Sequence, residues 1–454
     1  MVQQVIFIIV TLAAGWWAVR QYRRIWRNIQ LGQEEEIGGD AGQRWRNVLL
    51  VAFGQQKMFK NWLPAIFHLF IYVAFVITQI ELIEIMVDGF TGRHRIFAGS
   101  LGGFYTFVIS TIEVLSLLAL IATVIFLARR NLLRIPRFRK PEMTSWPVLD
   151  ANLILIGEVL LIIGIFSMNS ADIVLQGMRP DDYHATGQFL LSSQVGPALF
   201  GNLPADTLVA VERSGWWLHY LVVLGFLNYL PRSKHLHILL AFPNTYFARL
   251  RSRGQMDNMP EIQQEVRSML GLAAETEPMA DDDLPEFGAK DVFDLSWKTL
   301  LDAYTCTECG RCTAVCPANL TGKKLSPRKV MMDIRDRVEE VSQKLESGNP
   351  EFIREEARGE GARLTADNFD DGRSLFDLTT PEELHACTTC NACVEACPVL
   401  IDPLRPILAM RRYEILTLSQ GPPDWTPMFT SLENTGSVWQ MQEEREAWTE
   451  ENET

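Results

Sequence analysis

The sequence has no cysteine before residue 306 and none after residue 397. All eight cysteines fall in two short clusters in the second half of the chain. A disulfide framework scatters its cysteines more widely and needs an oxidising compartment. Clusters this dense instead indicate metal ligation in a reducing compartment.

The chain also lacks an excess of positive charge, since its formal net charge is −13. This acidity argues against nucleic acid as a partner. Long apolar runs are missing after residue 245, although they dominate the residues before it. With 454 residues, the chain is longer than a single core usually supports. The sequence therefore predicts an apolar membrane half followed by an acidic soluble half.

Five stretches approach the roughly 20 apolar residues that a membrane-spanning helix needs. They are Val5–Val19, Trp62–Val87, Phe104–Ala128, Val148–Phe166 and Gly215–Leu240. The first lacks the basic start and the small-residue cleavage site of a signal peptide, so we expect a retained anchor. The sequence predicts a mainly α fold that begins with a five-helix transmembrane bundle.

Positive charge is distributed unevenly between the loops. The loops after the first, third and fifth spans are rich in Lys and Arg, whereas loops 88–103 and 167–214 contain few. Cytoplasmic loops of membrane proteins carry such an excess. We therefore expect a multi-pass protein of a prokaryotic plasma membrane, with its N-terminus outside and its C-terminal half in the cytoplasm.

Both cysteine clusters have the spacing C-x2-C-x2-C-x3-C-P, in "CTECGRCTAVCP" and "CTTCNACVEACP". In two-cluster ferredoxins, three cysteines of such a run bind one [4Fe–4S] cluster and the fourth binds the other. We expect one cluster on Cys306, Cys309, Cys312 and Cys397, and a second on Cys387, Cys390, Cys393 and Cys316. The alternative is a pair of structural zinc sites, whose usual signature has longer gaps between paired cysteines.

Crossed ligation requires the two motifs to pack together although about 70 residues separate them. Helices are predicted to begin at Ser326-Pro327 and at the capping box Thr380-Pro381-Glu382-Glu383. Four segments follow from these patterns. They are a transmembrane domain of five spans (1–245), a cytoplasmic linker (246–297), a helical dicluster (two-[4Fe–4S]) ferredoxin domain (298–410) and a C-terminal tail for partner contact (411–454).

The last span carries three histidines, His219, His235 and His237. On a straight helix, His219 and His237 are eighteen residues and therefore five turns apart, which places them on one face and roughly 27 Å apart. His235 would fall on nearly the opposite face. A kink at Pro231 would change these relative positions around the helix axis.

His68 lies near the cytoplasmic start of the second span, at the same expected depth as His237 near the end of the fifth. Two imidazoles at one depth on antiparallel helices are what the axial ligation of a haem requires. The alternative is that His235 and His237 are interfacial residues beside Arg232 and Lys234.

Four glutamates lie in or near the spans, and carboxylates there usually line a polar cavity or a proton route. They are Glu81, Glu84, Glu113 and Glu158. Each is a candidate for the border of a quinone pocket, although for Glu84 we favour the outer interface.

The histidine followed by Pro-x-Ser-Lys-x-x-His at the end of the last span resembles the cytochrome b subunit of respiratory nitrate reductases. The resemblance is stronger to the membrane subunit of membrane-bound heterodisulfide reductases. It covers roughly residues 1–245 and aligns "PAIFHLF" with the first haem-ligand helix. It implies that His68 and His237 bind haem b. By the same resemblance His219 is a ligand of a second haem, but Thr78 stands where two-haem relatives have its partner. One haem is therefore expected, and His219 is left open between a second haem, a quinone contact and packing.

Residues 295–450 resemble the small iron–sulfur subunit of heterodisulfide reductases, including the tail "MRRYEILTLSQ…LENTGSVW…REAW". In longer relatives a Cys-Cys-Gly domain follows, whereas this sequence has no adjacent cysteine pair. The resemblance implies that such chemistry lies on a separate Cys-Cys-Gly-domain iron–sulfur subunit or is absent. It also implies an electron-transferring flavoprotein as a partner.

These features predict an oxidoreductase subunit that passes electrons between a cytoplasmic partner and a quinone, with menaquinone implied as the substrate. Its cofactors would be two [4Fe–4S] clusters and haem b, and the cofactors rather than any catalytic side chain would perform the redox chemistry. One alternative is a membrane-anchored docking protein whose clusters relay electrons without a redox-active haem. Another is a cluster-based redox sensor. The lack of a recognisable output domain argues against this alternative.

Overall fold

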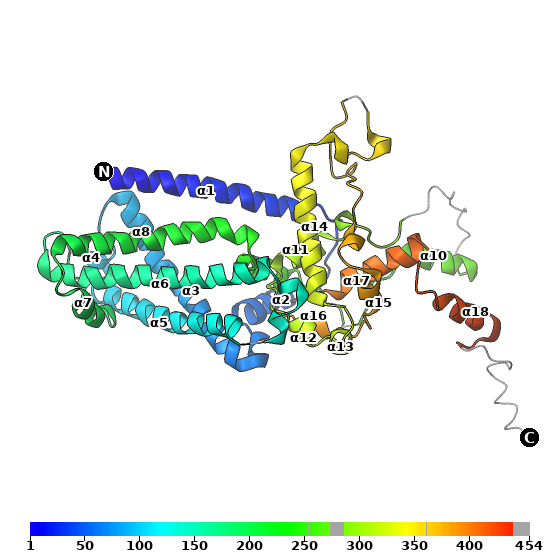
Figure 1. Cartoon of the computed structure of the whole chain (residues 1–454), viewed down its shortest axis with the longest axis horizontal. Coiled ribbons are helices and arrows are strands. Elements are labelled where there is room, and N and C mark those ends of the chain that lie inside the picture. Colours follow the sequence, from blue (N-terminus) through cyan, green and yellow to red (C-terminus); the bar gives the residue numbers. More distant parts are fainter. Residues whose placement is uncertain (134, 253, 273–285, 360, 439–454) are drawn as a thin grey trace, which may run out of the picture.

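The computed structural model describes residues 1–133, 135–252, 254–272, 286–359 and 361–438. Within these residues the fold is mainly α-helical, and the only β-structure is two isolated bridges, Gln33 with Ser296 and Ile353 with Phe369. Long helices lie side by side in one half of the molecule, and the shorter helices of the soluble half gather at one end of them (Figure 1). The N-terminus lies at the opposite end of this bundle (Figure 1).

Four helical segments of the described chain are long and apolar enough to cross a membrane. They contain α1 (Val2–Ile29), α3 (Trp62–Thr91), α5 (Gly103–Asn131) and α6 (Trp146–Met178). The first four predicted spans are therefore present, each as a longer helix than its apolar core indicated. A fifth helix, α8 (Ala205–Tyr229), packs along α6 and completes the bundle, although it is not among the four.

The predicted fifth span, Gly215–Leu240, is not one continuous helix. Helix α8 ends at Tyr229, and two 3₁₀ turns follow, at Leu230–Arg232 and Lys234–Leu236. A new helix, α9 (His237–Tyr246), begins at His237. Pro231 lies in the first of these turns. It interrupts the helix because proline has no backbone N–H and its ring clashes with the preceding turn. The expected five-turn alignment of His219 with His237 is therefore wrong.

Helices α6 and α8 approach each other closely through two glycines. A Cβ atom on Gly215 would lie 2.7 Å from the backbone oxygen of Gly164. A Cβ atom on Gly164 would lie 3.1 Å from the Cβ atom of His219. Small residues allow membrane helices to pack backbone against backbone. This contact fixes His219 against α6 in the interior of the bundle.

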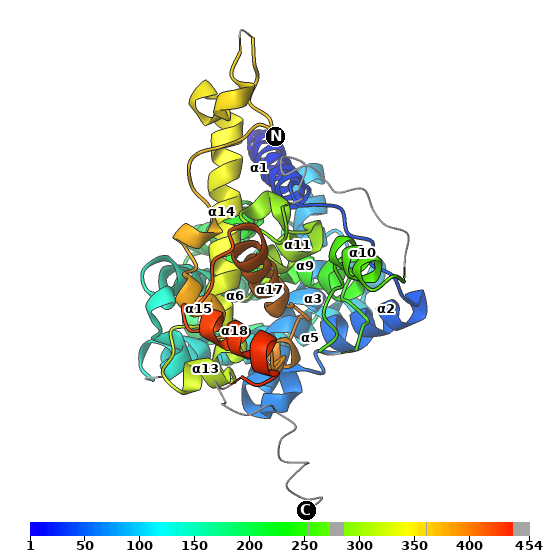
Figure 2. The ribbon, with the colours of Figure 1, turned by 90° about the vertical axis from the view of Figure 1, so that its right-hand side faces the viewer.

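The soluble half is a set of short helices around one longer helix, α14 (Pro327–Ser347), which stands across the end of the bundle (Figures 1 and 2). Ser326 caps α14 by accepting a hydrogen bond from the Lys329 N–H, and Thr380 and Glu383 form a capping box, so both predicted helix starts are confirmed. The other helices there are α11 (Trp297–Thr305), α12 (Arg311–Ala314), α13 (Pro317–Leu320), α15 (Pro381–His385), α16 (Ala392–Ala396), α17 (Leu404–Arg412) and α18 (Trp425–Thr435).

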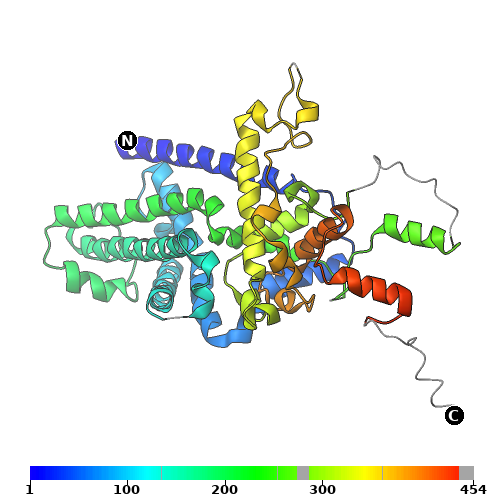
Figure 3. The ribbon, with the colours of Figure 1, turned by 45° about the vertical axis from the view of Figure 1, so that its right-hand side comes forward.

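The remaining helices are short and lie in loops. They are α2 (Ala41–Asn47), α4 (Ala98–Leu101), α7 (Ser192–Phe200) and α10 (Pro260–Met269). Helices α10 and α18 project from the side of the soluble half that faces away from the bundle (Figure 3). Residues 439–454, which hold the end of the predicted tail, and residues 273–285 of the predicted linker lie outside the described residues.

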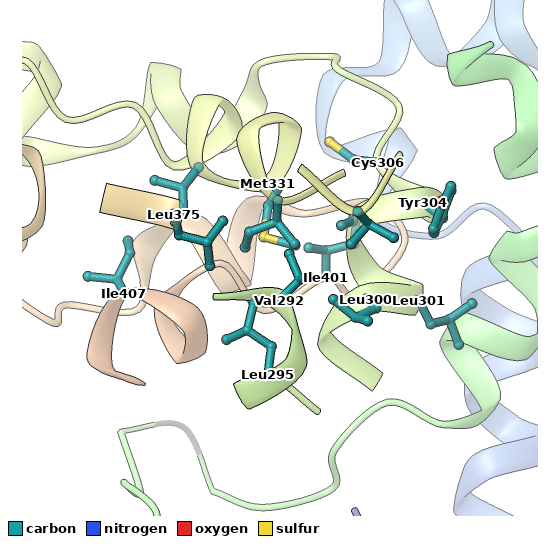
Figure 4. Close-up of a cluster of buried hydrophobic side chains, with 14 of the residues drawn as sticks. Val292, Leu295, Leu300, Leu301, Tyr304, Cys306, Met331, Leu375, Ile401 and Ile407 are labelled. Atoms are coloured by element: carbon teal, nitrogen blue, oxygen red, sulfur yellow. The ribbon is translucent and has the colours of Figure 1, made fainter. Parts of the chain in front are cut away.

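One hydrophobic core holds the soluble half together. It includes Leu300, Met331, Leu375 and Ile407, which come from four separate segments (Figure 4). Val292 and Leu295, which the sequence assigns to the linker, are also buried in this core. A short capped 3₁₀ turn (Val292–Asp294) turns their side chains inward, a packing role that composition did not indicate.

A buried ion-pair network connects α14 to the segments on either side of the core. Arg337 is 1% exposed; its Nε donates to Asp291 Oδ1 at 3.0 Å and its Nη1 donates to Asp371 Oδ2 at 2.7 Å. Arg337→Ala would remove the cation beside Asp291 and leave Asp371, among the described residues, paired with Lys344 alone, and breaking a buried pair in this way costs about 3–5 kcal/mol. We expect the temperature at which the visible cluster absorption bleaches to fall by on the order of 10 °C.

The matched control is Arg373→Ala, because the Arg373 side chain is exposed and, within the described residues, forms its ion pair with Glu340 alone. Such surface pairs contribute about 1 kcal/mol or less. Equal bleaching temperatures for the two variants would contradict the structural role given to Arg337.

Candidate functional site: the cysteine motifs and the histidines beside them

The two cysteine motifs adopt the same backbone conformation. Glu308 and Thr389, each two residues after the first cysteine, have φ values of 51° and 55°. Gly310 and Asn391, each one residue after the second cysteine, have φ values of 69° and 60°. Glycine and asparagine are the residues that accept this left-handed region most readily. The two loops are therefore equivalent folds of one motif, although only one of them uses glycine at the turn.

The structure brings the fourth cysteine of each motif to the other motif. Burial raises the pKa of Cys397 to about 12, and the neighbouring Cys309 and Cys306 thiols add to the rise. Burial and the neighbouring Cys387 raise the pKa of Cys393 to about 12, with a further contribution from Cys316. Cys397 thus lies beside the first motif, and Cys316 lies beside the second.

Backbone amides point at two of these sulfurs. The N–H of Thr389 donates to Cys387 Sγ at 3.4 Å, and the N–H of Ile401 donates to Cys397 Sγ at 3.3 Å. Burial also raises the pKa of Cys306 to about 11, so this thiol is protonated at neutral pH without metal. Metal binding to such a site deprotonates the thiols and releases their protons. The donor set fits iron–sulfur ligation, in which N–H groups stabilise thiolate charge.

The first motif faces the membrane bundle. Buried Glu308 pairs with Lys234, in the turn after α8, and accepts a hydrogen bond from Arg335 of α14 at 2.9 Å. Burial alone would raise the pKa of Glu308, but Arg335 and Lys234 outweigh it and lower the pKa. Arg311, beside Cys312, donates to the backbone oxygen of Lys57 at 3.1 Å.

The three basic loops of the sequence all meet the soluble half. Lys57, after the first span, donates to the backbone oxygen of Glu395 at 2.9 Å. Lys140, after the third span, donates to Asn319 Oδ1 at 2.8 Å. Asn244, after the fifth, donates to the backbone oxygen of Val399 at 2.9 Å. The charge pattern predicts these three loops on one side of the membrane. In the structure all three lie at the end of the bundle where the cysteine motifs lie.

Three of the predicted histidines gather at this same end of the bundle. His68 of α3 interacts electrostatically with His237 and with Arg311 of the first motif. The rings of His235 and His237 lie 5.4 Å apart between their centroids. The expectation that His235 lies on the opposite face from His237 is therefore wrong. It assumed one straight helix, and the turns around Pro231 interrupt that helix.

Each predicted haem-ligand histidine is held by its Nδ1 atom. His68 Nδ1 lies 3.0 Å from Gln55 Oε1, His237 Nδ1 lies 3.0 Å from the backbone oxygen of Lys234, and His219 Nδ1 lies 3.1 Å from that of Leu161. Among the residues that the structure describes, no Nε2 atom of these rings has a hydrogen-bond partner. A histidine that ligates a metal almost always donates its other ring nitrogen in this way. These rings therefore fit axial ligation through Nε2.

His219 lies apart from the other three. It is buried on α8, ten residues before the helix ends at Tyr229, which is about 15 Å of helical rise. The structure does not bring a second histidine to it within the described residues, and Thr78 of α3 bonds instead to its own helix at the backbone oxygen of Phe75.

Three of the four predicted glutamates form part of a polar network at the far end of the bundle. Glu84, expected at the outer interface, is buried and accepts hydrogen bonds from the Phe97 N–H at 3.1 Å and from Tyr105 Oη at 2.7 Å. Glu81 lies 3.6 Å from Arg95. Glu113 accepts from the Leu191 and Ser192 N–H groups at the start of α7. Glu158 lies elsewhere, beside Thr123.

Some residues of the site carried no clear signal in the sequence. Gln55 positions His68 from a loop residue with φ of 49°, and nothing in its surroundings marks it as a partner of a histidine. The Lys234–Glu308 pair crosses between two halves of the chain. A partial signal existed for Arg95, since buried acids in membrane helices imply a buried cation nearby.

Comparison with known proteins supports the prediction that the cysteine motifs bind two [4Fe–4S] clusters. The family model described as a 4Fe-4S dicluster domain matches residues 305–401. A probable iron-sulfur-binding oxidoreductase of Bacillus subtilis, FadF, is 28% identical over 98% of this chain. An EtfAB:quinone oxidoreductase of Syntrophomonas wolfei is 24% identical over 87% of it, and a probable membrane-anchored ferredoxin of Chromohalobacter salexigens is 37% identical over 31%.

The chain spans 60% of the length of the Bacillus relative, 52% of the Syntrophomonas relative and 20% of the Chromohalobacter relative. No solved structure matches the chain significantly. These relatives support an electron-transfer role through [4Fe–4S] clusters, in a protein with membrane-spanning helices.

Proposed function

We propose that this chain is a membrane-bound subunit that passes electrons between a cytoplasmic partner and a quinone. Its carriers are two [4Fe–4S] clusters and haem b, and menaquinone is the proposed substrate. The observation that carries the proposal is the meeting of His68, His237 and the first cysteine motif at one end of the bundle. The name of the Syntrophomonas relative, EtfAB:quinone oxidoreductase, supports the same pair of partners for this chain.

Each chain element has a separate task in this proposal. His68 and His237 would hold haem b through Nε2, and Gln55 and the Lys234 carbonyl orient the two rings. The haem, when bound, supplies a one-electron carrier at the membrane surface. Arg311 and the Lys234–Glu308 pair hold the first motif against this end of the bundle. His219 is the proposed ligand or contact for a second haem or the quinone.

The two clusters have different surroundings. Cys306, Cys309, Cys312 and Cys397 form the proposed cluster that faces the bundle, because Arg311 of that motif interacts with His68 and Arg137 of the loop after α5 interacts with Cys309. Cys390, in the proposed cluster with Cys387, Cys393 and Cys316, is exposed. Exposure at the second cluster supports the entry or exit of electrons there, through a cytoplasmic partner.

Membrane orientation follows from the basic loops. All three meet the soluble half, and the excess of Lys and Arg favours the cytoplasmic side. The N-terminus of α1 is then outside, and residues 298–410 form a cytoplasmic ferredoxin domain. The proposed partner is a Cys-Cys-Gly-domain iron–sulfur subunit, an electron-transferring flavoprotein, or both.

Crossed ligation gives a direct prediction. Cys397→Ala should remove the same electron paramagnetic resonance signal as Cys312→Ala, and Cys316→Ala the same signal as Cys390→Ala. Each variant should retain about four of the eight or so cluster irons, in addition to the haem iron, because only one cube loses a ligand. The measurement is iron content with a low-temperature spectrum of the dithionite-reduced protein. If Cys397→Ala instead removed the signal that Cys390→Ala removes, each motif would hold its own cluster.

A membrane-anchored docking protein is the competing function. In that case the histidines only pack, and the clusters relay electrons between soluble partners. The Nε2 atoms of His68 and His237, which have no hydrogen-bond partner among the described residues, favour the haem-containing alternative. Haem content of the purified protein and quinol-dependent reduction of its clusters separate the two functions.

A further inference from the structure

An arginine of the membrane half lies against the first cysteine motif. Arg137 belongs to the 3₁₀ turn Pro136–Phe138, in the loop between α5 and α6. A Cβ atom on Gly310, the residue after Cys309, would lie 3.5 Å from the Cβ atom of Arg137. The Arg137 guanidinium also interacts electrostatically with Cys309. The loop therefore brings a cation to the motif that faces the bundle.

The position of Arg137 is fixed by contacts on both sides of its loop. Arg328, which is fully buried on α14, donates from Nη1 to the backbone oxygen of Arg137 at 2.7 Å. Its Nη2 atom donates to Oε1 of Glu142, farther along the same loop, at 2.6 Å. The Arg137 guanidinium lies over the Phe138 ring, with 5.0 Å from Cζ to the ring centroid. The charge of Arg137 is therefore held beside the motif.

This charge has no carboxylate partner in the part of the chain that the structure describes. There, the buried Nε atom of Arg137 has no hydrogen-bond partner, and its guanidinium forms no ion pair. Burial lowers the pKa of Arg137, the neighbouring Cys309 raises it, and three other arginines lower it further. These arginines are Arg129, Arg311 and Arg328. A guanidinium stays charged in such surroundings, and a buried charge is costly unless an opposite charge lies beside it.

The surroundings of the second motif are more balanced. One arginine, Arg411, and one carboxylate, Asp402, act on its thiols with opposite signs. The first motif also has a carboxylate, Glu308, but that side chain is already paired with two cations. Glu308 therefore does not offset the charge of Arg137. Four thiolates with a [4Fe–4S] cluster carry net negative charge, and such a group would supply the missing counter-charge.

We infer that Arg137 raises the reduction potential of the proposed cluster that faces the bundle. Reduction adds one electron, and hence one unit of negative charge, to a cluster, while no bond forms or breaks and no proton moves. The electron comes from the quinol or the cytoplasmic partner of the proposed function. A fixed cation stabilises the more negative, reduced form more than the oxidised form. The inference rests on the proposed function and adds a membrane-half residue that sets the potential of one cluster.

The test is a potentiometric titration of the purified full-length protein, with both clusters followed by electron paramagnetic resonance. Arg137→Gln should lower the midpoint potential of the signal that Cys312→Ala removes. At a fixed ambient potential, the ratio of reduced to oxidised cluster should fall on the order of tenfold, which is about 59 mV for one electron. The midpoint of the signal that Cys390→Ala removes should change much less.

Two further variants separate charge from structure. Arg137→Lys keeps the positive charge and should keep most of the wild-type potential, which a purely structural role would not predict. The matched control is Arg139→Gln, which removes the same charge from the same loop. Because Arg139 is exposed, water and salt screen its charge, and both midpoints should stay at their wild-type values.

The possible outcomes separate this inference from the proposed function. If Arg137→Gln retains both clusters at their wild-type midpoints, the inference fails and the proposed function stands. A shift in the haem midpoint alone would also overturn it, because the arginine would then act on the haem. If Arg137→Gln loses the cluster, Arg137→Met decides, and loss of the cluster in both variants overturns the inference in favour of a structural role. A wild-type protein without haem, whose clusters quinol does not reduce, would instead refute the proposed function.

Discussion

His68→Ala should remove the haem b band from the reduced-minus-oxidised spectrum while the protein keeps its iron–sulfur clusters. In the part of the chain that the structure describes, His68 and His237 both have an anchored Nδ1 and an Nε2 without a hydrogen-bond partner, at the cysteine-bearing end of the bundle. An axial pair needs both imidazoles, so losing one removes the low-spin haem. We expect the haem content to fall from about one per chain to nearly zero. The measurement is a pyridine haemochrome assay beside an iron and sulfide analysis.

The neighbouring histidines provide matched controls for this result. His237→Ala should lose the band as His68→Ala does, whereas His235→Ala should keep it, although the two rings lie 5.4 Å apart. His184→Ala should be unchanged, because His184 is exposed elsewhere. Gln55→Ala should weaken haem retention by about 10- to 100-fold, the usual cost of losing such an orienting partner. A normal band in His68→Ala would refute the axial pair.

Cys312→Ala should abolish electron exchange between a cytoplasmic donor and the quinone, while the other cluster remains reducible. The first motif contacts Lys57, and its Arg311 interacts with His68, so the cluster proposed on Cys312 would lie between the second proposed cluster and the histidines. Cys390 is exposed, so a soluble donor would reach the cluster proposed there directly. The measurement is quinone reduction at saturating reductant, beside the spectrum of the remaining cluster.

The control for this order of carriers is Cys390→Ala. It should lose exchange with a protein donor, but quinol should still reduce the cluster that faces the bundle. In Cys312→Ala the opposite should hold, since quinol would no longer reduce the remaining cluster. Unchanged quinone reduction in Cys312→Ala would show that electrons bypass the first motif.

The general architecture followed from short-range features of the sequence. Apolar runs of membrane length predicted α1, α3, α5 and α6, because the length of a spanning helix is dictated by the bilayer. The capping residues Ser326 and Thr380 predicted the starts of α14 and α15, because they act within one turn. The cysteine spacing predicted two equivalent motifs, and the fourth cysteine of each lies beside the other motif.

Features that depend on tertiary contacts were not predictable in the same way. The sequence predicts a kink at Pro231. The extent of the break, which brings His235 beside His237, depends instead on the packing around Lys234. Gln55 reaches His68 only after the chain has turned between two helices. The buried position of Glu84 depends on Tyr105 and Arg95, which meet it from other elements.

The central claim is a continuous path from cytoplasmic iron–sulfur clusters to a quinone in the membrane. Its most direct test is the anaerobic addition of menadiol to the oxidised, purified wild-type protein, with the haem b and cluster signals recorded together. The account predicts a Soret band at about one haem per chain and reduction of both kinds of centre. A protein that carries about eight irons but shows no Soret absorption, and whose clusters menadiol leaves oxidised, would contradict it.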